Sequence, residues 1–218
     1  MIEAERIFDT REALAEGLAR DVADELARAI EAKGKATLAV SGGSTPKLFF
    51  GKLSSIDIPW ARVSVTLVDE RQVPDTSERS NARLVRTHLL QNKAAAAHFI
   101  PLAGNPEAEK APPFDVAILG MGNDGHTASF FPGADRLAEA LDENTTNRLI
   151  ELTAPGAGEP RLTFTLPVLQ SASRLKLHIE GVEKKDVLRK ALQNGPREEM
   201  PVRALLRSAA PLTLYWCP

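Results

Sequence analysis

One segment restricts the possible fold more than any other. Residues 114–122, "FDVAILGMG", form a nearly continuous apolar run that ends in glycines. Such a run is typical of a strand buried on both faces, as in a parallel sheet covered by helices. Two similar runs, "KATLAVSGG" at 35–43 and "RVSVTLVDE" at 62–70, also end in turn-forming or charged residues. We therefore expect several buried strands that end in short polar loops.

Helical patterns alternate with these strands. Between residues 10 and 33, apolar side chains recur every four positions, which predicts a long amphipathic helix. Helices are also predicted at 45–53, with Pro46 in the first turn, at 77–90 and at 182–192. This alternation predicts a three-layer α/β fold with a largely parallel sheet, helices on both faces and a Rossmann-like topology. The proline- and glycine-rich stretches at 103–113 and 154–160 are short enough to be loops, so one domain is expected over residues 1–218.

Charge and cysteine content exclude several classes of function. The 27 basic and 29 acidic residues give a net charge of −2, which provides no extended field for nucleic acid or an anionic membrane. A single cysteine, Cys217, excludes an internal disulfide framework and a cysteine-rich zinc site. No stretch approaches the ~18 apolar residues of a membrane span, and the N-terminal sequence lacks the features of a signal peptide. A cytoplasmic protein is expected, with a small-molecule substrate rather than nucleic acid or membrane as its partner.

The loop after the first buried strand is a candidate anion site. In "SGGSTP", Gly42, Gly43, Ser44 and Thr45 lie between a strand and a helix. Free amides and two hydroxyls can converge there on an anion at the helix N-terminus. The same residues also suit a tight turn with a hydroxyl cap, and the spacing alone leaves both interpretations open.

The second strand end carries three charges in a row, Asp69, Glu70 and Arg71. Charges beside a buried strand are costly unless they face water, pair or bind a ligand. A solvated cluster is the simpler interpretation of the triplet alone. Its place at a strand end, where α/β proteins bind their ligands, favours a side chain that points into the crevice.

The third strand end contains the only histidine that follows a glycine-rich turn. In "GMGNDGHTASF", glycines allow a ligand to approach the backbone, and Asp124 precedes His126 by two residues. Histidine exchanges protons near neutral pH, so His126 is a candidate general base. A capping aspartate with a structural histidine is the alternative. His88, His98 and His178 lie in helix or strand contexts and are interpreted as structural.

Two further features concern cofactors and the anion site. Lys184 or Lys185 follows another predicted strand, where an ammonium group could join an anion site, although most such lysines are solvated. No cluster has the histidine or cysteine spacing of a metal site, and the GxSxG nucleophile motif is absent. No metal or organic cofactor is therefore expected.

Taken together, five segments resemble the 6-phosphogluconolactonase family in order and spacing. They are "SGGSTP", "LVDERQVPDTSERSN", "FDVAILGMGNDGHTASFFPG", "RLTFTLPVL" and "GVEKKDVL", and they span nearly the whole chain. The resemblance implies the sugar-phosphate isomerase-like α/β fold and a carboxylic ester hydrolase without a cofactor. The implied reaction is hydrolysis of 6-phospho-D-glucono-1,5-lactone to 6-phosphogluconate in the oxidative pentose phosphate pathway.

The resemblance also implies roles for particular residues. His126 would be the general base that activates water, and Asp124 and Asp69 would orient the histidine, the water or sugar hydroxyls. Arg71 would stabilise the oxyanion or contact the phosphate. Gly42, Gly43, Ser44 and Thr45 match the family's phosphate loop, and Lys184 matches the lysine that helps to hold the 6-phosphate. No metal ligands are implied.

Two alternatives remain at this stage. The related glucosamine-6-phosphate deaminases carry a glutamate that assists the histidine, and Phe131 occupies that position here. An aromatic hydrocarbon ring cannot relay a proton, so the substitution favours hydrolysis. A sugar-phosphate-binding protein without catalysis would commonly lose its base, whereas His126, Asp124, Asp69 and Arg71 are all present. The sequence does not indicate the oligomeric state or the tolerance for other phosphorylated lactones.

Overall fold

A computed structural model describes residues 2–111 and 113–218, in which the larger sheet is entirely parallel. Its seven strands lie in the order β1 (Ile2–Ile7), β10 (Leu212–Cys217), β9 (Arg174–Glu180), β6 (Val116–Leu119), β2 (Ala36–Val40), β3 (Val63–Leu67) and β5 (His98–Ile100). The central strands β2 and β6 are buried throughout. The predicted parallel sheet is therefore confirmed. Residue 112, within the predicted 103–113 loop, and residue 1 lie outside the described residues.

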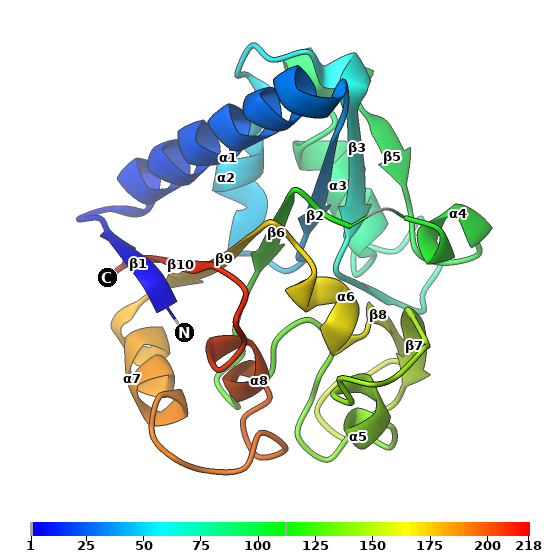
Figure 1. The fold of residues 1–218 in the computed structure, drawn as a ribbon, viewed down its shortest axis with the longest axis vertical. Helices are drawn as coiled ribbons and strands as arrows, with labels where there is room; N and C mark the ends of the chain where they lie inside the picture. The colour runs from blue at the N-terminus through cyan, green and yellow to red at the C-terminus, as the bar shows by residue number, and fades with distance from the viewer. Residues whose placement is uncertain (1, 112) are drawn as a thin grey trace.

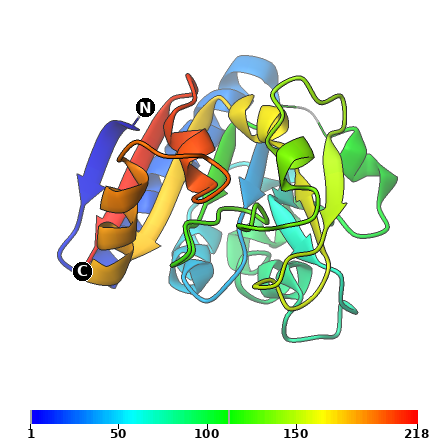
Figure 2. The same cartoon turned by 90° about the horizontal axis from the view of Figure 1, so that it is seen from below.

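Helices cover both faces of this sheet and form the outer layers. Figures 1 and 2 place α1 (Arg11–Lys33) and α2 (Pro46–Ser54) on one face, and α7 (Val182–Ala191) and α8 (Val202–Leu206) on the other. The remaining helical segments are α3 (Asn81–His88), α4 (Pro106–Glu109), α5 (Leu137–Ala140), α6 (Leu166–Gln170) and the 3₁₀ turns η1 (Trp60–Arg62) and η2 (Asn92–Ala96). The three-layer prediction is confirmed.

The long helix α1 shows how the apolar pattern produces this packing. The side chain of Thr10 accepts a hydrogen bond from the amide of Ala13 at 3.1 Å, which caps the helix at its start. The apolar residues spaced by four are all buried against the sheet: Leu14, Leu18, Val22, Leu26 and Ile30. Full burial of one such side chain contributes roughly 1.5–3 kcal/mol, so this face anchors the helix.

A second, smaller sheet was not predicted. It is antiparallel and consists of β4 (Asp69–Arg71), β8 (Arg161–Phe164) and β7 (Leu149–Leu152). The prediction of one strand over 62–70 is wrong, because the chain changes sheets at Val68. The amide of Val68 donates to Val40 in the large sheet at 2.9 Å, and its carbonyl accepts from Phe164 in the small sheet at 3.1 Å.

The topology determines where a ligand can bind. Since neighbouring strands of the large sheet are parallel, the carboxyl ends of β2, β6 and β9 lie at the same edge. The transfer at Val68 brings the small sheet to that edge as well. Among the described residues, no helix is both long and apolar enough to cross a membrane.

Candidate active site

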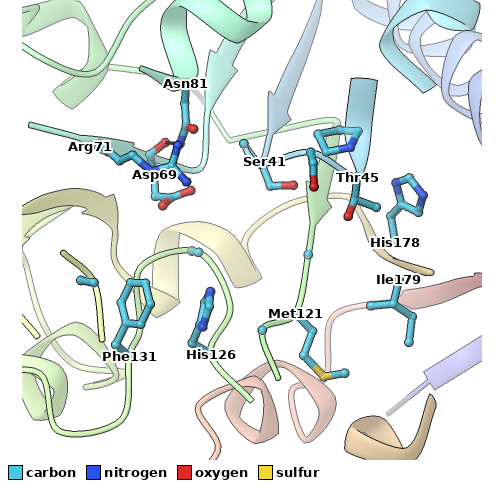
Figure 3. A pocket seen from close by; sticks show the side chains of 18 of the residues that line it. Ser41, Thr45, Asp69, Arg71, Asn81, Met121, His126, Phe131, His178 and Ile179 are labelled. Atoms are coloured by element: carbon cyan, nitrogen blue, oxygen red, sulfur yellow. Dashed lines mark hydrogen bonds between the residues drawn. The ribbon is translucent and has the colours of Figure 1, made fainter. Parts of the chain in front are cut away.

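A pocket of about 380 Å³ opens at the carboxyl edge of the large sheet (Figure 3). Segments that are distant in sequence contribute its walls: the turn after β2, strand β4, the start of α3, the loop after β6, the loop before β8 with the first residue of β8, and the end of β9 with the start of α7. The pocket brings together eight of the nine predicted site residues: Gly42, Gly43, Ser44, Thr45, Asp69, Arg71, His126 and Lys184. The ninth, Asp124, lies behind the histidine and contacts it.

The turn after β2 presents unused polar groups at one end of the pocket. Thr45 directly precedes α2 but makes no capping hydrogen bond through its side chain, and Pro46 occupies the first helical turn. Among the described residues, neither hydroxyl of Ser44 and Thr45 has a hydrogen-bond partner. These hydroxyls and the N-terminal amides of the helix are available to an anion.

Gly42 is required here for close approach rather than for an unusual backbone angle. A Cβ atom at this position would lie 1.9 Å from Oδ1 of Asn81. Asn81 is itself buried, and its Nδ2 donates to the main-chain oxygen of Asp69 at 2.9 Å. Asn81 therefore packs against the turn after β2 and is hydrogen-bonded to β4, so it lies between two walls of the pocket.

The loop after β6 holds the imidazole of His126 in one orientation. Nδ1 lies 2.6 Å from Oδ1 of Asp124, and the amide of His126 donates to the same oxygen at 3.1 Å. Gly122 permits this arrangement, because a Cβ there would lie 2.1 Å from Nδ1 of the imidazole. An ionised carboxylate only accepts hydrogen bonds, so in the neutral imidazole Nδ1 carries the proton and Nε2 keeps the lone pair that a general base needs.

The surroundings of this loop keep Asp124 ionised, so that it continues to accept the hydrogen bond from His126. Burial by itself raises the pKa of Asp124, but the hydrogen bonds from the side chain and amide of His126 lower it more, so the pKa lies below its usual value. Burial lowers the pKa of Lys184, while the negative charges of Asp124 and Glu183 act in the opposite direction. Lys184 therefore shares the electrostatic environment of the histidine–carboxylate pair.

Strand β4 divides the charged triplet between two sides. Because side chains alternate along a strand, Asp69 and Arg71 face the pocket. The carboxylate of Asp69 is buried and accepts from Oγ of Ser129 at 2.6 Å, so it contacts the histidine loop without contacting the imidazole. Arg71 donates through one terminal nitrogen to the carbonyl of Arg79 at 2.7 Å, and its buried Nε has no protein partner among the described residues.

Glu70, the middle residue of the triplet, has a structural role instead. Its carboxylate accepts from the amides of Asn81 and Ala82 at 2.8 and 2.7 Å, at the start of α3. Burial raises the pKa of Glu70, and these backbone hydrogen bonds oppose that shift. The buried charge thus pairs with the orphan amides of a helix N-terminus.

Removal of this carboxylate is expected to destabilise the fold. Glu70→Ala leaves buried amides of α3 without an acceptor, so the free energy of unfolding should fall by roughly 2–4 kcal/mol. Urea titration followed by circular dichroism measures the change. Gln72→Ala, at an exposed position two residues later, serves as the control and should change stability by less than about 0.5 kcal/mol. Equal stabilities for the two variants would show that Glu70 does not support the helix.

Several residues of the pocket were not predicted as site residues. His178 was interpreted as structural, which agrees with its buried side chain and with its Nε2 lying 3.1 Å from Oε1 of Glu180, although it also lines the pocket. Phe131 and Arg161 also line the pocket, and neither was predicted as a site residue from its own chemistry. Lys185 lies apart from these groups, because its Nζ is 3.8 Å from the centre of the Trp216 ring. Only Lys184 of the two adjacent lysines reaches the pocket.

The described residues contain no group of three histidine, cysteine or acidic side chains placed to hold a metal ion. The polar groups that converge on the pocket are instead a histidine–carboxylate pair, cationic side chains and free hydroxyls. A histidine with a fixed tautomer can transfer a proton, and the cations and hydroxyls can hold an anion. Fold and site together define an α/β enzyme class that performs acid–base chemistry on a small anionic substrate.

Comparison with known proteins narrows this class to a family. Residues 9–216 match the family described as glucosamine-6-phosphate isomerases/6-phosphogluconolactonase, and the chain belongs to that family. The chain is 54% identical to a 6-phosphogluconolactonase of Rhizobium meliloti over 97% of both chains. It is 44% identical to a 6-phosphogluconolactonase of Pseudomonas putida, over 94% of this chain and 89% of the relative.

Solved structures agree with the sequence comparison. The fold matches a crystal structure of a 6-phosphogluconolactonase from Shewanella baltica with a TM-score of 0.93 and 39% identity over the full length of both chains. A putative 6-phosphogluconolactonase from Neisseria gonorrhoeae matches with a TM-score of 0.95 and 36% identity, again over both full chains. These matches confirm the predicted family and its sugar-phosphate isomerase-like fold.

Proposed function

We propose that this chain hydrolyses 6-phospho-D-glucono-1,5-lactone to 6-phospho-D-gluconate, as a carboxylic ester hydrolase of the oxidative pentose phosphate pathway. The names of the relatives in this family support the substrate and reaction. The observation that carries the mechanism is the pairing of Nδ1 of His126 with Asp124, because it leaves Nε2 as a base in a pocket that also contains an anion-binding turn.

In the proposed mechanism, Nε2 of His126 accepts a proton from water while the water oxygen attacks the lactone carbonyl carbon. The tetrahedral intermediate then collapses, and the bond between the carbonyl carbon and the ring oxygen breaks. The imidazolium returns its proton to that leaving oxygen. The carboxylic acid that forms ionises at neutral pH, so each turnover releases one proton. Asp124 stabilises the transient imidazolium and keeps the ring in the required tautomer.

The remaining site residues are assigned by their chemistry. The hydroxyls of Ser44 and Thr45, the amides of the Gly42–Gly43 turn and the ammonium of Lys184 hold the phosphate. Asp69 accepts a hydrogen bond from a sugar hydroxyl or from the attacking water. The Nε–H of Arg71 has no partner in the part of the chain that the structure describes, and it donates either to the developing oxyanion or to the phosphate.

A specific observation favours hydrolysis over the isomerase and deaminase chemistry found in the same family. The ring of Phe131 lies beside the imidazole of His126, with ring centres 4.2 Å apart (Figure 3). A hydrocarbon ring cannot relay a proton to a sugar ring, whereas lactone hydrolysis needs only one base. Glucosamine 6-phosphate therefore serves as the negative control substrate.

Proton release on freshly generated lactone tests the function. Because the lactone also hydrolyses spontaneously, the purified protein must accelerate proton release above the rate in buffer alone. Consumption of the lactone at the spontaneous rate would refute the proposed activity. Ammonia release from glucosamine 6-phosphate, without acceleration of lactone hydrolysis, would support the deaminase alternative.

The proposal includes two statements about the chain as a whole. The described residues act as one domain, because the pocket takes its walls from both sheets. The cytoplasm is the proposed compartment, and an unpaired, buried Cys217 is compatible with a reducing environment.

Lys184→Ala is expected to weaken binding of the phosphorylated lactone. A charge-assisted contact to phosphate contributes to ground-state and transition-state binding alike, so KM should rise roughly ten- to a hundredfold with little change in kcat. Hydrolysis of unphosphorylated glucono-1,5-lactone should keep its kcat/KM, because that substrate lacks the group that the lysine holds.

Lys185→Ala provides the matched control, since it removes an adjacent ammonium that lies on Trp216 instead. This variant should keep the KM of the wild type. An unchanged KM in Lys184→Ala, or an equal loss with both substrates, would remove Lys184 from the phosphate site.

A further inference from the structure

The imidazole of His126 has an aromatic support that the mechanism above does not use. The Phe131 and His126 rings are 4.2 Å apart at an interplanar angle of 30°. Phe131 is 5% exposed, so packing fixes its ring, whereas 30% of the His126 side chain is exposed. The partly exposed base therefore depends on a buried neighbour for part of its orientation.

Arg161 links this neighbour to the small sheet. It begins β8, the central strand, and pairs with Arg71 of β4 and Leu152 of β7. Its guanidinium carbon lies 5.3 Å from the centre of the Phe131 ring, within the range of a cation–π contact. One terminal nitrogen donates to the carbonyl of Ala157 at 2.5 Å, which fixes the direction of the side chain.

The other contacts of Arg161 do not explain why a cation is buried there. The side chain is 7% exposed, and Glu159 is 3.9 Å away. That carboxylate already accepts a hydrogen bond from Arg79 at 2.8 Å. Nε of Arg161 is buried without a partner among the described residues. The negative charges of Asp69 and Glu159 favour the cation, but burial outweighs them and lowers the pKa of Arg161. A guanidinium that is buried at this cost, with one direct hydrogen bond among the described residues, calls for a further role beside the pocket.

We propose that Arg161 is a positioning residue for the general base: its guanidinium holds the Phe131 ring against the imidazole of His126. The inference rests on the proposed function, because only a proton-transfer reaction requires a fixed imidazole. Asp124 fixes the edge of the ring through Nδ1, and Phe131 supports its face. Two restraints together define the direction of Nε2.

The kinetic test compares Arg161→Met with the wild type. Loss of the support lets the imidazole leave the productive geometry, so kcat should fall roughly ten- to a hundredfold while KM changes by less than about threefold. Arg161→Lys keeps a cation near the ring and should recover part of the lost kcat. A raised KM at unchanged kcat would instead mean that Arg161 contacts the substrate, and it would overturn the proposal.

A double-mutant cycle tests whether Arg161 acts through Phe131. Phe131→Leu should lower kcat in the same way, and the double variant should be no slower than the slower single variant. Losses that multiply in the double variant would show independent roles and would refute the proposed path.

The NMR signals of the His126 ring test the positioning role of Arg161 independently of catalytic activity. The ring current of Phe131 shifts the ring protons of His126, so Arg161→Met should move the assigned His126 resonance toward its position in Phe131→Leu. If the resonance stays in place in Arg161→Met, the positioning role is wrong even if turnover falls. If the resonance moves but the wild type does not accelerate lactone hydrolysis, the proposed function has failed while the contact is real.

Arg148→Met is the matched control. Arg148 also donates a hydrogen bond from one terminal nitrogen to a carbonyl, that of Ala111 at 2.6 Å. Its buried Nε likewise has no partner within residues 2–111 and 113–218. It lies outside the walls of the pocket. Arg148→Met should therefore keep both kcat and the His126 resonance, even if its unfolding temperature falls as much as that of Arg161→Met.

Discussion

His126→Ala is expected to lose roughly 10²- to 10⁴-fold in kcat for lactone hydrolysis, the range that a positioned general base contributes. Nε2 of His126 is the proposed acceptor of the water proton. Of the carboxylates that line the pocket, Asp69 accepts a hydrogen bond from Ser129, and Glu180 lies 3.1 Å from Nε2 of His178. The variant should approach the spontaneous rate of the lactone. Continuous proton release at several enzyme concentrations measures the difference.

A measurement of product binding distinguishes the loss of the general base from a disruption of the pocket. The proposed phosphate site, formed by the turn after β2 and Lys184, remains in His126→Ala. The Kd for 6-phosphogluconate, measured by calorimetry, should therefore change by less than about threefold. His98→Ala removes an exposed histidine paired with Glu107 and should keep full activity. A fully active His126→Ala enzyme would refute the assigned base, and loss of product binding would show that the substitution had disrupted the site.

The sequence predicted the parts of this fold that are determined by local patterns. Apolar residues at every fourth position from Leu14 to Ile30 predicted α1, and continuous apolar runs predicted the buried strands β2 and β6. Strand β1 was missed because it lies at the edge of the sheet, and its exposed residues Glu3, Glu5 and Arg6 lack an apolar alternation. Hydrophobic periodicity contains little information about an edge strand.

The sequence did not predict Arg161 as a site residue, because its position depends on the pairing of strands that are distant in the chain. Arg161 reaches the pocket because β8 pairs with β4. In that pairing, Arg161 lies opposite Arg71, which is 90 residues earlier in the chain. No local pattern indicates that pairing. Parallel topology alone was enough to place the turn after β2 and the loop after β6 at one edge. A charged residue at the start of the apolar segment "RLTF" was the available signal for Arg161, since a buried strand rarely carries an unpaired arginine.

The orientation of the charged triplet also depends on pairings between distant segments. The strand pattern placed Asp69, Glu70 and Arg71 at a strand end without indicating which side chains face the pocket. Only the family resemblance implied site roles for Asp69 and Arg71. Period-two alternation within β4 directs the first and third inward, while Glu70 accepts hydrogen bonds from the start of α3. Alternation becomes informative only after the partner strand and the covering helix are known.

Asp124→Asn is expected to impair catalysis more than Asp124→Ala, although asparagine is closer to aspartate in shape. The amide of asparagine can donate a hydrogen bond to Nδ1 of His126, which places the ring proton on Nε2 and removes the base. Alanine leaves the ring without a partner, so the productive tautomer remains accessible. We expect kcat to fall roughly 10²- to 10³-fold in Asp124→Asn and about tenfold less in Asp124→Ala.

The pH dependence of the wild type provides an independent check on this dyad. Because the hydrogen bonds from His126 hold the pKa of Asp124 below its usual value, the carboxylate stays ionised in mildly acidic solution. Protonation of Asp124 should therefore not limit activity in mildly acidic solution, and ¹⁵N resonances of His126 should show Nδ1–H when the imidazole is neutral. Two results would show that Asp124 does not select the tautomer: a higher kcat in Asp124→Asn than in Asp124→Ala, or a neutral imidazole protonated at Nε2 in the wild type. Either result would rule out Nε2 as the group that activates water.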